Sequence, residues 1–336
     1  MSERSNAEQI AVVAKTYHTW ITGLTLALIS KKGSKIAEQF IFRLFRKQHH
    51  EKFLAGLEKL GLKNEPAAVA CAKYHYFSNQ LGGVSVEYLE ETSKKAWIRY
   101  PPPRWIWFGS AICAVPENVN RAMLYGWHAQ NGVTLGNPCL GFVCTGTTVE
   151  GAAGLEGFYI EFDSPIEPKD RLQFRFDLEC PLIAKQELPK LDSQLWPMER
   201  KAKAYRNYAM EYIRTALPIV LNLLGEEEAD RITILCSKQV GMQLYAELRK
   251  SFEIEDDSRE SFIMFLSDFL TVSGDFVSNL SGNTLARDYW RLYPNKVFPF
   301  VERCETSLLS GMLAAHNRFL TLDRKANPEQ TKFILT

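Results

Sequence analysis

Residues 65–101 read EPAAVACAKYHYFSNQLGGVSVEYLEETSKKAWIRYP, and this stretch decides the fold. Pro66 opens a helical pattern and a Gly-Gly pair ends it, because proline is favoured in the first turn of a helix and glycine just beyond the last. The letters VSVEYLEE and KAWIRY then alternate as strands do, with a turn at Thr92 and Ser93. The stretch therefore predicts a helix followed by an antiparallel hairpin.

Further elements of the same kinds lie on both sides of this stretch. Apolar residues at helical spacing predict a helix over 35–60, which Gly61 ends. After the hairpin, a proline-rich junction precedes a helix from Pro116 through His128 and two more strands, LGFVCTGTTV and GFYIEFD. The first half of the chain is thus two helices, a strand pair, a helix and a second strand pair.

The second half of the chain repeats this order. Helical patterns cover 199–224, 227–252 and 258–274, and they are followed by the strands DFVSNL and TLARDYWRLYP, the helix FPFVERCETSLLSGMLAAHN and the strands RFLTLDRK and TKFIL. His128 falls close to His316 when the halves are aligned. We therefore predict an α+β fold of two related units that arose by internal duplication, each with helices on one face of an antiparallel sheet.

Prolines and mixed charge interrupt the periodic pattern between 180 and 200, which places the boundary between the units there. We expect an N-terminal helical arm at 1–34, a first unit with the candidate ligand pocket at 35–190, and a second unit at 191–336 that is structural or dimerising. The apolar run from Trp20 to Ser30 is too short to span a membrane. It is expected to be buried in the core or against another subunit, with attachment to a membrane surface as a third alternative.

The composition bounds the partners and the compartment. Forty basic and thirty-nine acidic residues leave a net charge of +1 among 336 residues, so the chain lacks the positive charge expected of a nucleic-acid-binding protein. Its seven cysteines are odd in number and scattered, unlike a secreted disulfide framework. We expect reduced thiols, a cytoplasmic protein, no transmembrane segment and a homodimer formed through the second unit.

Two histidines are candidates for acid–base chemistry. His75 and Asn79 are four residues apart and share one face of the predicted helix, where the carboxamide can hold the tautomer of the imidazole. His128 stands beside Tyr125 and Trp127 at the end of a helix, before a glycine-rich turn. The alternatives are a histidine buried for packing at 75 and one that caps the helix end at 128.

The turn and strands that follow contribute two cysteines and a carboxylate. Cys139 and Cys144 lie five residues apart, which matches no familiar zinc site, so no metal is predicted. Cys139 is a candidate nucleophile with His128 or His75 as its base, whereas Cys144, on a strand, either lines the pocket or belongs to the core. Glu161 alternates with apolar residues on the returning strand and either lines the pocket or is solvated.

Two further segments are candidates for ligand contacts. The loop GTTVEGAAGLEG joins two strands and lacks the spacing of a phosphate-binding loop, so it is interpreted as a flexible connection that can close over a ligand. The segment IRYPPPRWIWFG places Arg99 and Trp105 on a rigid proline stretch. Rings and guanidinium groups together suit a flat or anionic ligand or, alternatively, an interface between domains or subunits.

The element order resembles that of the L-2-amino-thiazoline-4-carboxylate hydrolase-like family and the related vinyl-reductase-type small-ligand domains, over roughly 52–163 and more faintly over 200–335. The resemblance implies a small-molecule pocket, a Cys-Pro pair at the strand-to-helix junction, and cysteine with aspartate in the later helix and closing strand. This chain has Tyr100-Pro101-Pro102, Trp127-His128 and Glu156-Gly157-Phe158 at those places. The implied thiols are missing, so only the location of the pocket carries over.

Together these observations predict a small-molecule hydrolase or ring-opening enzyme that acts on a C–N or C–S bond of a polar heterocycle or amide. The alternative is a binding protein that holds an aromatic or hydrophobic ligand by stacking, and a scaffold without a pocket is the third reading. No cofactor is assigned. The expected catalytic residues are His128, His75, Cys139 and Glu161, and the expected ligand contacts are Asn79, Arg99, Trp105, Tyr125, Trp127, Asn131 and Cys144.

Overall fold

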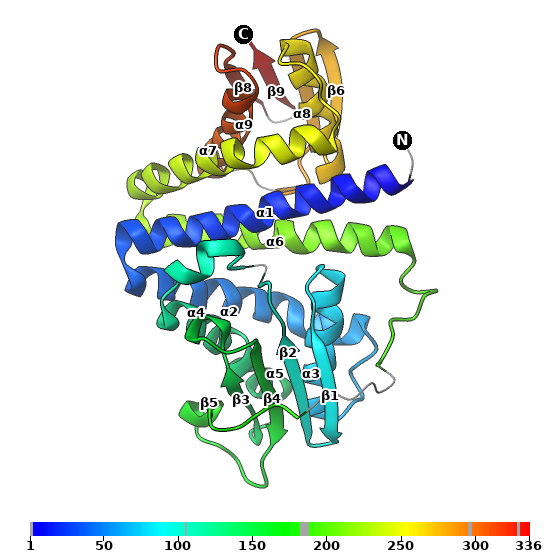
Figure 1. Cartoon of the computed structure of the whole chain (residues 1–336), viewed down its shortest axis with the longest axis vertical. Helices are drawn as coiled ribbons and strands as arrows, with labels where there is room; N and C mark the ends of the chain where they lie inside the picture. Colours follow the sequence, from blue (N-terminus) through cyan, green and yellow to red (C-terminus); the bar gives the residue numbers. More distant parts are fainter. Residues whose placement is uncertain (1–2, 105, 182–187, 295–297, 328–329) are drawn as a thin grey trace. The chain divides into compact units, whose positions relative to one another are not determined.

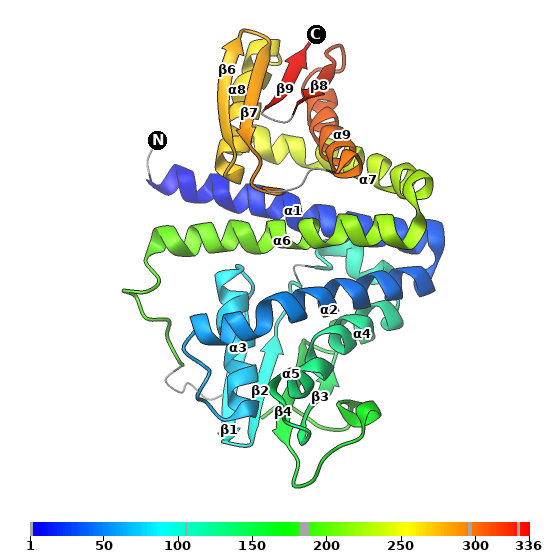
Figure 2. The same cartoon turned by 180° about the vertical axis from the view of Figure 1, so that it is seen from behind.

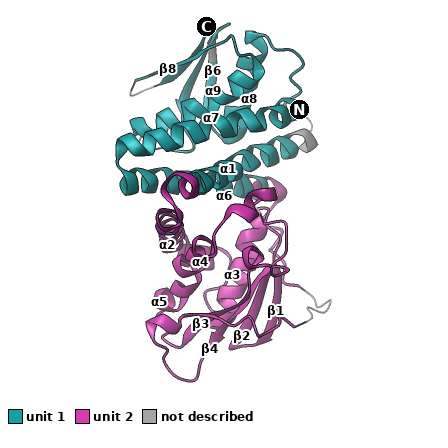
Figure 3. Cartoon of the chain, turned by 60° about the vertical axis from the view of Figure 1, so that its left-hand side comes forward, with its two compact units in different colours: residues 1–27, 202–336 teal, residues 28–201 magenta. Residues whose placement is uncertain are grey.

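The computed structural model confirms the α+β fold class (Figure 1). The chain divides into two compact units, of which unit 1 comprises 1–27 and 202–336 and unit 2 comprises 28–201 (Figure 3). This division differs from the predicted one, because the expected arm at 1–34 is shared between the units. The residues described by the structure are 3–104, 106–181, 188–294, 298–327 and 330–336.

The helices of unit 2 follow the sequence pattern closely. The predicted helix at 35–60 is α2, the second predicted helix is α3, and the hairpin turns at Ser93 and Lys94, one residue later than predicted. The third helix ends two residues before His128, which instead begins a short 3₁₀ helix. The elements in this part are α2 (Ser34–Lys59), α3 (Ala67–Leu81), β1 (Glu87–Thr92), β2 (Lys95–Tyr100), η1 (Gly109–Ala114), α4 (Glu117–Gly126), η2 (His128–Gln130) and α5 (Asn131–Leu135).

Five strands form the sheet of unit 2, in the order β1-β2-β4-β3-β5 (Figure 1). Figure 2 shows β1, β2, β4 and β3 of this sheet from behind. The strands β3 (Leu140–Gly146) and β4 (Leu155–Glu161), joined through η3 (Thr148–Glu150), are the predicted pair. After η4 (Pro168–Asp170), the short strand β5 (Leu172–Phe174) pairs parallel with β3 and has no counterpart in the sequence prediction.

The two faces of this sheet differ in what covers them. Helix α3 contacts β1, β2 and β4 on one face. On the other face Trp97, Val143 and Phe158, which are aligned across three strands, form a separate apolar cluster. Because successive side chains of a strand point to opposite faces, Tyr159 and Phe142 lie on the face that carries α3.

Unit 1 contains the remaining elements, all of which the sequence predicted. Its sheet has the order β6-β7-β9-β8, and every neighbouring pair is antiparallel. None of the helices in the described part of the chain is both long and apolar enough to cross a membrane. The elements are α1 (Glu3–Lys32) and α6 (Met198–Leu224), each of which continues into unit 2, and α7 (Glu226–Ser251), α8 (Arg259–Ser273), β6 (Phe276–Ser281), β7 (Thr284–Tyr289), α9 (Pro299–His316), β8 (Leu322–Ala326) and β9 (Thr331–Leu335).

The two units share one order of elements and one order of strands. Counted along the chain within each unit, the first four strands lie in the order first, second, fourth, third in both sheets. In both units the helix before the first strand pair packs on the sheet, and the helix between the strand pairs packs against an earlier long helix, α4 on α2 and α9 on α7.

Glycine allows both of these helix pairs to approach closely. A Cβ atom on Gly241 of α7 would lie 2.1 Å from a backbone carbonyl oxygen of α9, and one on Gly311 of α9 would lie 2.1 Å from a backbone carbonyl oxygen of α7. In unit 2, a Cβ atom on Gly126 would lie 2.7 Å from a backbone carbonyl oxygen of α2. Gly126 therefore holds the end of α4, and with it the start of η2, against α2.

We expect Gly241→Ala to lower the free energy of unfolding by about 1–3 kcal/mol, because the added methyl group forces α7 and α9 apart. Without that contact, alanine would stabilise a helix interior by about 0.5–1 kcal/mol relative to glycine. Urea denaturation measures the difference, and Gly282→Ala is the control, because nothing lies within 4 Å of its added methyl group. An unchanged or raised stability of Gly241→Ala would contradict the close approach.

Candidate functional site

Elements of unit 2 bring the two predicted histidines together. His75 lies in α3 and His128 follows α4, and their imidazole rings stack with centroids 4.3 Å apart and planes 10° apart. Both side chains are buried. The ring of Tyr159 on β4 lies 5.9 Å from that of His75 and 5.7 Å from that of His128. We call the surrounding group, which consists of His49, His75, Tyr100, Trp127, His128, Asn131 and Tyr159, the histidine cluster.

A chain of hydrogen bonds leads from α2 to His128. The guanidinium of Arg46 donates to Nδ1 of His49 at 3.2 Å, so Nε2 of His49 carries the proton and donates to the carboxamide oxygen of Asn131 at 2.9 Å. The Asn131 amide donates to the hydroxyl oxygen of Tyr159 at 3.0 Å. That hydroxyl donates to Nδ1 of His128 at 2.6 Å. Because a neutral imidazole has one donor and one acceptor nitrogen, the chain places the proton of His128 on Nε2.

His75 is held from its other side by Tyr100. The Tyr100 hydroxyl lies 2.8 Å from Nδ1 of His75. The Asn79 amide donates to that hydroxyl at 3.3 Å and to the backbone carbonyl oxygen of His75 at 2.8 Å. Asn79 therefore acts on the imidazole of His75 through Tyr100, and not by the direct contact that the spacing predicted.

Aromatic rings surround the two stacked imidazoles. Trp127 lies 5.9 Å from His75 and 6.0 Å from Tyr74, and Phe142 lies 4.4 Å from His128, between ring centroids. Two buried polar atoms of the cluster, Nε2 of His75 and Nε1 of Trp127, have no hydrogen-bond partner among the described residues. Most buried polar groups in proteins are paired, so these two atoms are the groups of the cluster whose hydrogen-bonding capacity is unused.

Burial keeps the cluster uncharged near neutral pH. It lowers the pKa of His75 to about 3, and together with the charge of Arg46 it lowers the pKa of His49 to about 4. The pKa of His128 lies well below its usual value, first because of burial and then because His75 is adjacent. Burial raises the pKa of the Tyr159 hydroxyl well above its usual value. Burial therefore disfavours the cationic form of His128 that the helix-cap alternative requires, and α4 ends at Gly126, before His128.

The two predicted cysteines do not form a nucleophile with these histidines. Cys139 lies half-buried in the turn before β3, and within the described residues its thiol makes no hydrogen bond to His75 or His128. Cys144 is buried in β3, where its thiol donates to the carbonyl oxygen of Gly146 at 3.5 Å. Burial raises the pKa of Cys144 to about 12, so its thiolate does not form near neutral pH.

The carboxylate of Glu161 accepts hydrogen bonds at the start of a helix. It accepts a hydrogen bond from the backbone N–H of Ala68 in the first turn of α3, at 3.4 Å, and another from the side chain of Asn137 at 2.8 Å. Negative charge is favourable at a helix N-terminus. Glu161 lies on the face of the sheet that α3 covers, as Tyr159 does, and its carboxylate positions α3.

The predicted ligand contacts divide between the two faces of the sheet. Trp127 and Asn131 both lie in the histidine cluster. Arg99 lies on the opposite face, where it forms ion pairs with Glu87 at 3.0 Å and with Glu156 at 3.3 Å. The alternation of β2 separates Arg99 from the ring of Tyr100, so the structure does not bring Arg99 together with the histidine cluster.

Other predicted contacts also lie away from the cluster. Tyr125 is exposed, and its ring lies 6.1 Å from that of Phe174, so it does not line the site. Trp105 lies outside the described residues. The glycine-rich loop at 146–157 contains η3 and is attached to α4 by an ion pair between Glu150 and Arg121.

Sequence reasoning missed His49 and the hydroxyl of Tyr159. His49 follows Phe45 by four residues and precedes Phe53 by four, so it lies on the buried face of α2, and its ring stacks on Phe53 at 4.9 Å. That spacing was a usable signal. Tyr159 gave none, because alternation alone does not show which face of a sheet the helices cover.

We expect unit 2 to lose stability as the pH falls from about 7 towards 5, because unfolded histidines bind a proton near pH 6.5. Folded His49, with a pKa of about 4, does not bind it. Each such histidine therefore lowers the free energy of unfolding by about 1.4 kcal/mol per pH unit in this window. Urea titrations at several pH values measure this slope, which becomes less steep in His49→Gln.

The control for that experiment is His50→Gln, at the adjacent exposed position of the same helix. It should keep the slope of the unaltered protein. An equal slope in His49→Gln would show that His49 takes up its proton in the folded state.

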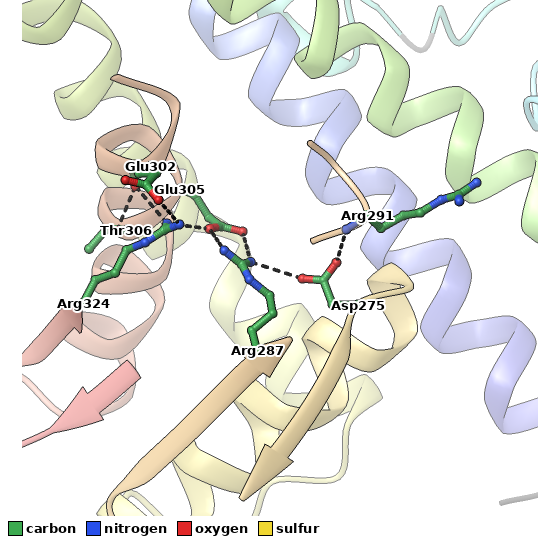
Figure 4. Close-up of polar contacts among 7 residues, drawn as sticks. All are labelled: Asp275, Arg287, Arg291, Glu302, Glu305, Thr306 and Arg324. Atoms are coloured by element: carbon green, nitrogen blue, oxygen red, sulfur yellow. Dashed lines mark hydrogen bonds and ion pairs between the residues drawn. The ribbon is translucent and has the colours of Figure 1, made fainter. Parts of the chain in front are cut away.

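A second buried polar cluster lies in unit 1 (Figure 4). Arg287 of β7 pairs with Asp275 at 3.1 Å and with Glu305 of α9 at 2.7 Å. Arg324 of β8 pairs with Glu305 at 2.8 Å and with Glu302 at 2.9 Å. Each carboxylate in this ionic cluster has a guanidinium partner, so we interpret it as a structural link between α9 and the sheet.

We expect Arg287→Met to lower the free energy of unfolding by about 3–5 kcal/mol, because Asp275 is left as a buried charge without its partner. Thermal or urea unfolding measures the loss. Arg303→Met is the matched control, because Arg303 forms more exposed ion pairs with Glu226 and Asp230 and should cost less than about 1 kcal/mol. Equal effects of the two substitutions would contradict a structural role for the buried pair.

The comparisons with known proteins add no relative. No family model matches the chain, and no curated protein or solved structure matches it. Within the described part of the chain, no group of three or more histidine, cysteine, aspartate or glutamate side chains is arranged to hold a metal ion. The function is therefore argued from the geometry of the site.

Proposed function

We propose that unit 2 binds a small, flat, neutral molecule at the histidine cluster. The observation that carries this proposal is the pair of buried polar atoms without partners, Nε2 of His75 and Nε1 of Trp127. A buried polar group left unpaired costs about 1–3 kcal/mol, so a molecule that pairs with these atoms binds favourably. Their rings lie 5.9 Å apart, within the reach of one small ligand.

The charge state of the site supports a neutral ligand. The low pKa values of His49 and His75 leave both imidazoles uncharged, and Tyr159 keeps its proton. A cationic ligand would lose its hydration without gaining an opposite charge from these groups. The buried guanidinium of Arg104, 4.8 Å from the ring centroid of Tyr100, would disfavour a cation further. The stacked rings of His75 and His128 instead offer aromatic faces, which favour a flat ligand.

Hydrolysis of a small amide or heterocycle is the second candidate function. The observation that favours it is the presence of N–H donors in a buried, apolar setting, where such donors stabilise the oxyanion of acyl transfer. The thiols do not assist, because burial raises the pKa of both Cys71 and Cys144. Water would then be the nucleophile with His75 as its base, because Nδ1 of His128 accepts from Tyr159 and its Nε2 carries the proton. Binding without catalysis requires no base.

Two broader inferences accompany this proposal. The shared order of elements and strands supports an origin of the two units by internal duplication, and it suits the resemblance to small-ligand domains of the hydrolase-like and vinyl-reductase type. The seven cysteines are free thiols, which supports a reducing, cytoplasmic location. Dimerisation through the C-terminal residues stays a prediction from the sequence.

We expect neutral aromatic probes, benzamide and quinoline, to bind saturably with one site per chain in ligand-observed NMR. Trp127→Phe keeps a ring but removes the unpaired N–H, so it should weaken the affinity by roughly threefold to tenfold. Trp97→Phe, on the opposite face of the sheet, is the matched control and should leave the affinity unchanged. Release of ammonia from benzamide would establish the second candidate instead, and a lack of saturable binding by either probe would contradict the proposal.

A further inference from the structure

A histidine in unit 1 makes the same bond as His128. His316 ends α9, which corresponds to α4 in the order of elements. A tyrosine hydroxyl lies at Nδ1 of each ring, that of Tyr245 at 2.5 Å from His316 and that of Tyr159 at 2.6 Å from His128. The two tyrosines come from different elements, a helix in unit 1 and a strand in unit 2. Both sites therefore share a hydrogen bond from a tyrosine hydroxyl to Nδ1 of the histidine, although the tyrosine lies in a helix in one unit and in a strand in the other.

The two histidines differ at the opposite ring nitrogen. Nε2 of His316 donates to the backbone carbonyl oxygen of Ser258 at 2.8 Å, so both of its ring nitrogens are paired. His128 forms its hydrogen bond at Nδ1 and packs by its ring faces against His75, Phe142 and Tyr159. Among the described residues of unit 2, no acceptor takes the place that the Ser258 carbonyl has in unit 1.

The polarity of Nε2 of His128 follows from the chain of hydrogen bonds that begins at Arg46. Because Tyr159 donates to Nδ1 of His128, the proton of the ring lies on Nε2, which is therefore a donor. Nε1 of Trp127 is also a donor, because an indole nitrogen keeps its hydrogen, and it has no partner. The histidine cluster thus offers donors that lack acceptors.

We propose that the ligand of the histidine cluster presents a hydrogen-bond acceptor, either a carbonyl oxygen or an unprotonated ring nitrogen, to Nε2 of His128. This inference rests on the proposed function and adds the polarity of the ligand to its shape and charge. A ligand whose polar atom is an N–H or O–H donor would face another donor and leave both unpaired. A site built on fixed hydrogen bonds rejects such a mismatch, so the cluster selects acceptors.

Tyr159 is the positioning residue for this selectivity. Its hydroxyl does not need to touch the ligand, because it acts by holding the proton of His128 on Nε2. Tyr159→Phe keeps the ring in the core and removes the hydroxyl, which leaves the proton of His128 free to occupy either nitrogen. The preference for an acceptor should then decrease, whereas a purely structural role of Tyr159 would weaken all ligands equally.

The first test reads the tautomer directly. Long-range proton–nitrogen NMR on the full chain labelled at its six histidines distinguishes an imidazole protonated at Nε2 from one protonated at Nδ1. We expect the Nε2–H tautomer at His128, and a mixture of tautomers in Tyr159→Phe. An Nδ1–H tautomer at His128 in the unaltered protein would overturn the inference, without bearing on whether the cluster binds a ligand.

The second test compares quinoline with indole, two neutral bicyclic probes of similar size. Quinoline has only an acceptor nitrogen and indole only a donor, so quinoline should bind more tightly, by roughly threefold to tenfold. This ratio should fall towards one in Tyr159→Phe. Tighter binding of indole would contradict the proposed preference for an acceptor, although the cluster would still bind a ligand. If neither probe shifts the resonances of His128 and Trp127, the proposed function fails and this inference fails with it.

Discussion

The histidine cluster depends on the single proton of the Tyr159 hydroxyl. Asn131 donates to the hydroxyl oxygen at 3.0 Å, so the proton of the hydroxyl is directed to Nδ1 of His128 at 2.6 Å. Burial removes water as an alternative partner and keeps the imidazole neutral. Whether each group donates or accepts thus follows from the hydrogen bond that precedes it in the chain. The chain begins at Arg46, whose guanidinium is always charged and can only donate. One donor on α2 thereby specifies the tautomer of a ring that follows α4.

The sequence predicted more of the fold than of the site. Hydrophobic periodicity predicts which residues are buried, whereas the site depends on which side chains form hydrogen bonds with one another. Helical spacing and strand alternation were enough for the order and approximate bounds of the elements in both units. The same alternation separates Arg99 from Tyr100 across the sheet, but it does not show which face α3 covers. Glu161 was therefore interpreted as a pocket residue or as solvated, whereas the structure engages it at the start of α3.

The two units use the same topology to stabilise different interiors. In unit 1, His316 is fully paired, and Arg287 has two carboxylate partners, which suits an element whose role is structural. In unit 2, the corresponding region has neutral imidazoles and two buried polar atoms without partners. Unit 1 also contains buried polar atoms without partners, at Nε of Arg287 and of Arg324, so the two interiors differ in their charge and in the pairing of their histidines. The binding that we propose for unit 2 depends on its neutral cluster.

Thiol chemistry of the kind implied by the family resemblance does not suit this site for a physical reason. A cysteine becomes a nucleophile when a positive charge or a base lowers its pKa. Here burial raises the pKa of Cys144 to about 12, and the same burial lowers the pKa of His75 to about 3, so neither group assists the other. An apolar enclosure that disfavours ions favours a neutral ligand recognised by directed hydrogen bonds. The burial that prevents a thiolate also fixes the direction of the donors in the cluster, on which the proposed selectivity depends.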